Sequence, residues 1–202
     1  MTKISKLYEL KLPLKKSEYN NGNRYASIHK YKKEKSQGYK ITLIKKESNV
    51  HDTLGKVNTT IKYLHLHSKI PTIVRKCIPD AACILTEISH YSDKLIETSY
   101  KNNHFSHDVF NVKIETRITT ENPYPDMELE VVDYSNGDDY IKCYKRIDVE
   151  INNWMMGWIA HEISESMKNQ ILEHHQLVVN LKDEWCDISV VELDKLENEL
   201  YN

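Results

Sequence analysis

Long apolar runs and closely spaced cysteines are both missing from this sequence. No stretch approaches the roughly 18 consecutive apolar residues that suggest a membrane-spanning helix, and the opening MTKISKLYELKL has no apolar run typical of a signal peptide. Four cysteines in 202 residues form no CxxC pair, which favours reduced thiols over a disulfide framework or a zinc site. The sequence therefore predicts a cytoplasmic protein whose contact with membrane surfaces is peripheral and transient.

Strong charge of one sign and the common catalytic signatures are missing too. With 28 basic and 30 acidic residues, the formal net charge is −2, which gives no reason to expect nucleic-acid binding. The sequence holds no GxSxG, P-loop, GxGxxG or HExxH motif, and its carboxylates lie by pattern on solvent-facing positions. No enzyme activity, metal or cofactor is expected.

Ten histidines raise the question of a metal site. His65 and His67 share one predicted strand face, so they could pair on a metal ion. His174 and His175 are adjacent on a predicted helix, which points them in different directions. Because no set of ligands has a recognisable metal spacing, the sequence favours solvated histidines.

The pattern along the chain predicts one domain over residues 1–202, since no repeat and no Pro-, Gly- or Ser-rich linker divides it. Residues 159–181 carry apolar side chains at spacings of three and four, which is typical of one face of a long amphipathic helix. Further helices are expected at 17–35, after Pro71, and after Ser189 as an N-cap. Alternating polarity predicts strands at 8–14, 39–46, 59–68, 82–89, 94–101, 108–119, 127–134 and 140–151.

Strands in series followed by a long helix predict an α+β fold. We expect a curved, mostly antiparallel sheet that grips the long C-terminal helix. Such an arrangement would enclose an interior cavity, although the pattern alone does not establish the cavity.

Several polar residues continue otherwise apolar strand faces. Thr60 and Lys62 share a face with two leucines, Thr98 shares one with Ile96 and Tyr100, and Thr116 shares one with Val112 and two isoleucines. Buried without partners, a lysine and three hydroxyls would be costly, and a phosphate with sugar-like hydroxyls would supply partners. The alternative is that Lys62 lies near a strand end and reaches solvent, as lysines usually do, while threonine favours strands in general.

A cluster of large apolar residues stands where the last strand meets the long helix. Trp154, Met155, Met156 and Trp158 surround Gly157. They are either part of the core or an exposed tip that enters the surface of a bilayer, where tryptophan is favoured and methionine adapts to irregular surroundings.

Four segments in the same order resemble the phosphatidylinositol transfer proteins. They are YELKLPLKKSEYNNGNRYA near the start, TIKYLHLHSKIPTIVR from Thr60 to Arg75, VKIET from Val112 to Thr116, and DEWCDISVVELDKLENE near the end. Together they span nearly the whole chain, and jointly they are far more specific than any one of them. The resemblance implies a START-like helix-grip fold that wraps one phospholipid.

The resemblance also implies roles for individual residues. The inositol contacts of the family fall on Thr60, Lys62 and Glu197, and its threonines near the phosphate fall on Thr98 and Thr116. A headgroup-binding glutamine in the region of the first helix falls on Asn23, a shorter amide. The tandem-tryptophan membrane-docking site falls on the cluster Trp154, Met155, Met156 and Trp158.

Some positions depart from the family pattern. A headgroup asparagine falls near Tyr91 or Ser92, and a cysteine linked with choline lipids falls on Ile96. The regulatory loop before residue 140 is largely missing, and the chain stops at Asn202, so a smaller lid is expected. These departures leave the headgroup preference open.

The function expected is the binding of one phospholipid, phosphatidylinositol first and phosphatidylcholine second, and its transfer between membranes by a monomer. The alternatives are a sensor or scaffold that presents its lipid without transferring it, and a carrier of another lipid such as phosphatidic acid.

Overall fold

The computed structural model describes residues 1–52, 54–67, 79–102, 104–106, 109–137, 139–152 and 157–201. Its centre is an eight-stranded sheet with the order β2-β3-β4-β5-β6-β8-β1-β7. The strands are β1 (Thr2–Leu12), β2 (Lys40–His51), β3 (Gly55–His65), β4 (Ile84–Tyr91), β5 (Ile96–Asn102), β6 (Phe110–Ile118), β7 (Leu129–Asp133) and β8 (Ile141–Ile151).

Pairing within the sheet is antiparallel except at one edge. Strands β2 to β6 follow one another as neighbours, and β6 then pairs with β8. The first strand fills the place between β8 and β7: Thr2 lies opposite Ile151 in the antiparallel pair, and Leu7 lies opposite Leu129 in the parallel pair. The sheet is therefore completed by a strand from the very start of the chain.

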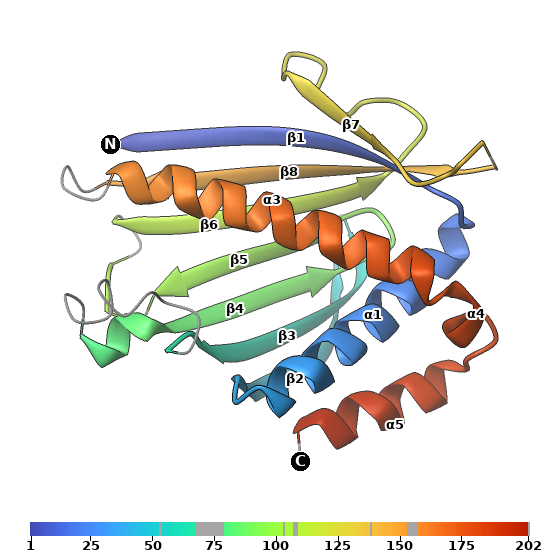
Figure 1. The fold of residues 1–202 in the computed structure, drawn as a ribbon, viewed down its shortest axis with the longest axis horizontal. Helices are drawn as coiled ribbons and strands as arrows, with labels where there is room; N and C mark the ends of the chain where they lie inside the picture. Colours follow the sequence, from blue (N-terminus) through green and yellow to red (C-terminus); the bar gives the residue numbers. More distant parts are fainter. Residues whose placement is uncertain are drawn as a thin grey trace.

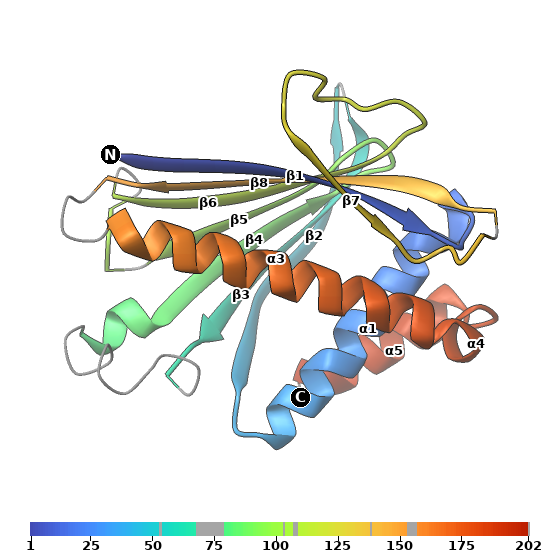
Figure 2. The same ribbon diagram turned by 45° about the horizontal axis from the view of Figure 1, so that its top comes forward.

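Helices cover one face and one end of this sheet. The long helix α3 (Gly157–Asn180) runs across the strands, as Figure 1 shows. Helix α1 (Lys16–Ser36) packs against α3 and against the C-terminal α5 (Val190–Tyr201), which follows the short α4 (Lys182–Trp185). A 3-10 turn, η1 (Asp80–Cys83), precedes β4. The turned view shows α1, α4 and α5 gathered near the C-terminal end of α3 (Figure 2).

The core lies between the sheet and α3. Inward-facing residues of β8 alternate with polar ones, and Ile147, Val149 and Ile151 are almost fully buried. Helix α3 contributes Ala160, Ile171 and Val178 from the apolar face that the spacing of three and four predicts. Trp185 from α4 is also buried, where it closes the core beneath α1.

The predicted α+β class with a mostly antiparallel sheet and a long C-terminal helix is confirmed. Strand β1 begins at Thr2 instead of residue 8, because its first half pairs with β8 without an apolar alternation that the sequence could reveal.

The predicted N-cap at Ser189 is confirmed, since its hydroxyl accepts the Glu192 N–H at 3.2 Å and the Glu192 carboxylate accepts the Ser189 N–H at 3.0 Å. The helix predicted after Pro71 lies outside the described residues. No helix in the described part of the chain is long and apolar enough to cross a membrane.

Candidate functional site: a cavity with a buried lysine

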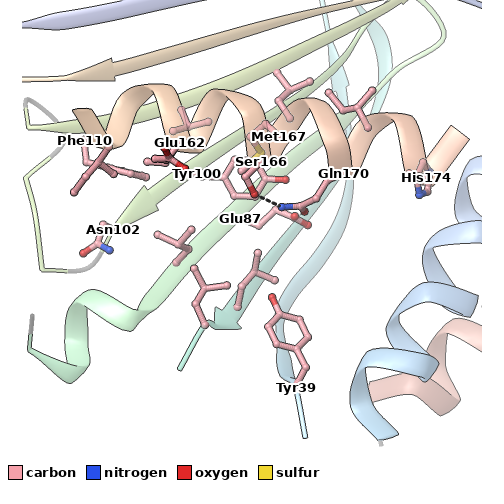
Figure 3. Close-up of a pocket in the computed structure, with 18 of the residues that line it drawn as sticks. Tyr39, Glu87, Tyr100, Asn102, Phe110, Glu162, Ser166, Met167, Gln170 and His174 are labelled. Atoms are coloured by element: carbon pink, nitrogen blue, oxygen red, sulfur yellow. Dashed lines mark hydrogen bonds between the residues drawn. The ribbon is translucent and has the colours of Figure 1, made fainter. Parts of the chain in front are cut away.

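A cavity of about 740 Å³ lies between the sheet, α1 and α3. Its walls are mainly apolar, and Figure 3 shows side chains of α3 and of the strands facing each other across it. The apolar lining includes Leu64 from β3, Leu66 just after it, Leu85 from β4, Val112 and Ile114 from β6, and Ile159, Ile163, Met167 and Ile171 from α3. A cavity with this wall suits a long apolar ligand.

One buried cation faces this cavity from the middle of β8. Lys145 is 8% exposed, and its Nζ donates a hydrogen bond of 2.9 Å to Oγ1 of Thr116 on β6. Burial lowers the pKa of the Lys145 ammonium. Among the described residues no carboxylate forms an ion pair with it. A buried ammonium without a counter-charge is costly, so this position favours an anionic ligand.

Two histidines of α3 line the same cavity, contrary to the expectation that they are solvated. The Tyr19 hydroxyl lies 3.1 Å from Nε2 of His175, whose Nδ1 lies 2.8 Å from the Ile171 carbonyl oxygen. His174 Nε2 lies 2.8 Å from Oδ1 of Asn23 on α1. Burial and then the charge of Lys145 lower the pKa of His174 to about 3. Both rings are therefore neutral at pH 7, and they are held by partners from α1 and from their own helix.

Lys62 is buried, so it faces the interior and does not reach solvent from a strand end. It is 6% exposed, and its Nζ lies 3.6 Å from Oε1 of Glu87, which is 7% exposed, on the neighbouring β4. Burial alone would lower the pKa of Lys62, but Tyr31 and the Glu87 carboxylate outweigh it and raise the pKa well above its usual value. Glu87 also corrects the expectation that the carboxylates face solvent.

The predicted hydroxyls lie on the same inner face. The register pairs Thr60 with Ser89 and Ser89 with Thr98, and the Ser89 and Thr98 hydroxyls are 3.1 Å apart. The Thr60 hydroxyl is buried and has no hydrogen-bond partner among the described residues, which is costly for a polar group. Thr60, Lys62, Thr98 and Thr116 therefore form part of one polar area of the sheet.

Glu197 lies on α5 and takes part in an ion network at the surface of this polar area. One of its carboxylate oxygens accepts hydrogen bonds of 2.9 Å from both Arg24 of α1 and Lys46 of β2. Burial acts to raise the pKa of Glu197, but these two partners outweigh it and hold the pKa below its usual value. Asp194, one turn earlier, also pairs with Arg24 at 2.6 Å. The network attaches α5 to α1 and to the sheet edge.

The cavity and the predicted inositol contacts are next to each other but not continuous. Thr60, Lys62 and Glu197 do not line the 740 Å³ cavity, whereas Glu87, the ion partner of Lys62, does. A second cavity of about 430 Å³ is lined by Thr116 and Ile96 together with Ser17 and Asn20 of α1. Thr116 therefore contacts this second cavity, while its partner Lys145 contacts the first.

Comparison with known proteins adds to this geometry. The family model described as "Phosphatidylinositol transfer protein" matches residues 3–134 and 126–202. The chain belongs to this family. Two relatives, the phosphatidylinositol transfer protein beta isoforms of Mus musculus and Rattus norvegicus, are each 31% identical to it over 113 residues. The match covers 56% of this chain and 41% of each relative, so it spans less than half of either relative's length.

The membrane-docking prediction for this family member is only partly covered by the structure. Trp158 at the start of α3 is 61% exposed, and it lines the cavity. Trp154, Met155 and Met156 lie outside the described residues. The docking role of the four residues stays a prediction.

Lys145 and Glu87 are two buried charged cavity residues that the sequence did not single out. Glu87 shares its strand face with Leu85, Ser89 and Tyr91, and Lys145 is the one charged residue on its face of Ile141–Ile151, whose other face is mostly charged. Alternation alone cannot show which face of a strand is inside when both faces carry charge. A signal was present for Lys145, because it shares its face with Cys143 and Ile147, both fully buried.

Proposed function

We propose that this member of the phosphatidylinositol transfer protein family encloses one phospholipid and carries it between membranes, with phosphatidylinositol as the favoured lipid. The observation that carries the proposal is the 740 Å³ cavity, which combines an apolar wall with a buried lysine that no carboxylate of the described residues neutralises. Membership of the family supports the same function.

The apolar wall suits the acyl chains. Moving a phospholipid through water exposes thirty or so methylenes, which costs on the order of 25 kcal/mol at ~0.8 kcal/mol per CH₂. In the proposal, Ile159, Ile163 and Met167 on α3 cover one side of the chains, and Val112 and Ile114 of β6 cover the other. A carrier has to offset nearly all of this cost, which requires that both chains be enclosed.

The phosphate is proposed to bind at Lys145. Its ammonium supplies the missing counter-charge, and Thr116, already bonded to it at 2.9 Å, offers a hydroxyl beside it. Thr98 is proposed as a further phosphate contact and Asn23 as a further headgroup contact, because the resemblance implies these roles. Asn23 is held toward the interior by His174 at 2.8 Å.

The inositol ring is proposed to reach Thr60, Lys62 and Glu197. The unpartnered Thr60 hydroxyl and the buried Lys62 support a polar ligand at this place. Docking through Trp158, with Trp154, Met155 and Met156, is proposed to bring the cavity to a membrane surface. Action as a monomer in the cytoplasm, with transient membrane contact, stays a prediction.

Two lysine variants test the proposal against a matched control. Protein purified from cells is analysed for bound lipid by native mass spectrometry and extraction, and transfer of phosphatidylinositol and phosphatidylcholine between vesicles is measured. Lys145→Met should lower the binding and transfer of both lipids, because both carry the phosphate. Lys62→Ala should lower phosphatidylinositol transfer alone, while Lys101→Met, at an exposed position of β5, should change neither.

The outcomes separate the alternatives. One phospholipid per chain, together with transfer, supports the carrier. Bound phospholipid without transfer would instead indicate a sensor or scaffold, and phosphatidic acid as the sole lipid would indicate a different cargo. A folded protein with no lipid in any preparation would refute the proposal. If Lys62→Ala lowers the melting temperature as much as it lowers transfer, the role given to Lys62 is wrong.

A further inference from the structure

Tyrosine rings surround the ammonium of Lys62. The Nζ atom lies 5.2 Å from the ring centre of Tyr31, on α1, and 5.9 Å from the ring centre of Tyr201, in the last turn of α5. Both distances are within the range of cation–π attraction. With the Glu87 carboxylate 3.6 Å away, the partners of Lys62 come from two helices and from the neighbouring strand.

A third tyrosine lies on the strand face of Glu87, because Glu87, Ser89 and Tyr91 alternate along β4. Tyr91 ends β4, opposite Asn58 on one side and Ile96 on the other. Burial raises the pKa of the Tyr91 hydroxyl, while the nearby charge of Lys62 acts to lower it. The resemblance places a headgroup asparagine near Tyr91 or Ser92, so neither position offers the expected amide.

The polar space beside Lys62 is therefore filled by tyrosine side chains of the protein itself. Thr60 is buried there with an unpartnered hydroxyl, and neither of the two cavities reaches it or Lys62. A six-membered polyol ring is about as large as one tyrosine ring, and close-packed interiors leave no room for both. An inositol group can reach Lys62 only if one of the rings leaves.

Of the three tyrosines, Tyr201 is held in place by contacts between α5 and the rest of the molecule, and these contacts can break. Helix α5 is attached through Glu197 and Asp194 to Arg24, and Lys35 of α1 donates a hydrogen bond of 3.0 Å to the Leu200 carbonyl oxygen. These partly exposed contacts are individually weak. Tyr31, in contrast, lies within α1, and Tyr91 within the sheet, so both are held by regular structure.

We infer that Tyr31, Tyr91 and Tyr201 determine headgroup selectivity by filling the space beside Lys62, so that an inositol headgroup must displace Tyr201 and the last turn of α5, while Glu197, one turn earlier, stays in place. The inference rests on the proposed function, because it concerns the selectivity of the same lipid site. A lipid whose headgroup stays near Lys145 leaves Tyr201 in place. Displacement therefore adds a cost for phosphatidylinositol that phosphatidylcholine does not incur.

The test compares two variants at Tyr201. Delipidated protein is incubated with vesicles of equal phosphatidylinositol and phosphatidylcholine content, and the bound lipids are counted by mass spectrometry. Tyr201→Ala removes the ring and should raise the bound ratio of phosphatidylinositol to phosphatidylcholine about tenfold. Tyr201→Phe keeps the ring and should leave the ratio unchanged. An unchanged or lower ratio for Tyr201→Ala would overturn the inference, since Tyr201 would then be neutral or a ligand of inositol.

A second variant and a second measurement guard against a folding defect. Tyr31→Ala, at a helical position that alanine favours, should change the ratio in the same direction. Hydrogen exchange of residues 198–201 in the unsubstituted protein should be faster with phosphatidylinositol bound than with phosphatidylcholine bound, and equal exchange would contradict displacement. If lipid is bound and only the ratio or the exchange fails, the selectivity inference alone falls. If no lipid is bound, the proposed function falls with it.

Discussion

Gly22 of α1 lies so close to Trp185 of α4 that a Cβ atom on the glycine would be 2.7 Å from the indole Cζ2. The tryptophan is almost fully buried, and its Nε1 donates a hydrogen bond of 2.8 Å to the Val178 carbonyl oxygen of α3. Glycine in the middle of a helix normally costs about 1 kcal/mol relative to alanine. Here the missing side chain lets α1 and the C-terminal segment approach each other.

Gly22→Ala should therefore destabilise the protein although alanine is the better helix former. Overpacking costs about 1 to 3 kcal/mol, which exceeds the helix-propensity gain of about 1 kcal/mol. We expect a net loss of about 1 kcal/mol in the free energy of unfolding, measured by urea denaturation. Combining it with Trp185→Phe should give a smaller loss than the two single losses added together. A stabilised Gly22→Ala protein would show that the indole moves aside at no cost.

The neutral His174 predicts a loss of stability in mild acid. Its pKa is lowered to about 3 in the folded protein, by burial first and then by Lys145 and Lys30, whereas an unfolded histidine titrates near 6.5. Between these values the unfolded chain binds the extra proton, so stability is full above pH 6.5 and decreases as the pH falls toward 3. Because the ring is only half-buried, we expect a loss on the order of 1 kcal/mol at pH 5.

The measurement compares urea denaturation at pH 7 and pH 5. His174→Phe should reduce the difference between the two pH values, whereas His161→Phe, exposed on the same helix, should leave it unchanged. An equal effect of both substitutions would mean that His174 is not the group responsible.

Lys145→Met should stabilise the delipidated protein while it weakens lipid binding. Replacing a buried charge by an apolar side chain of similar length removes the cost of desolvation. We expect a gain of about 1 to 3 kcal/mol in the free energy of unfolding, against a change within about 0.5 kcal/mol for the exposed Lys101→Met. A destabilised Lys145→Met protein would show that the hydrogen bond to Thr116 mainly supports the fold.

Most of the secondary structure was predictable because its periodicities are regular. The spacing of Ile159, Ile163, Met167 and Ile171 predicted α3, and the alternation around Lys62 correctly placed it on the same face as Leu64. The order of the strands was not predictable in the same way. Nothing local in residues 2–12 indicates that this strand pairs with both β8 and β7.

The polar lining of the cavity was harder to predict than its apolar wall. Glu87 and His175 are types that usually reach solvent, and only partners distant in sequence, Lys62 and Tyr19, show that they do not. The ring of Tyr201 beside Lys62 joins positions in β3 and α5 that no periodicity connects. Such contacts depend on tertiary packing, which a local pattern does not contain.

The place of β1 between β8 and β7 has a consequence for how the chain folds during synthesis. Lys3 and Glu150, paired across β1 and β8, are 147 residues apart, so at about 5–20 residues per second the ribosome needs about 7 to 30 s to make the partner of the first strand. The meander from β2 to β6 can form meanwhile from neighbours in sequence. Strand β1 is thus made well before its partner β8 and is among the last strands to join the sheet, so its apolar residues stay exposed to chaperones until β8 has been made.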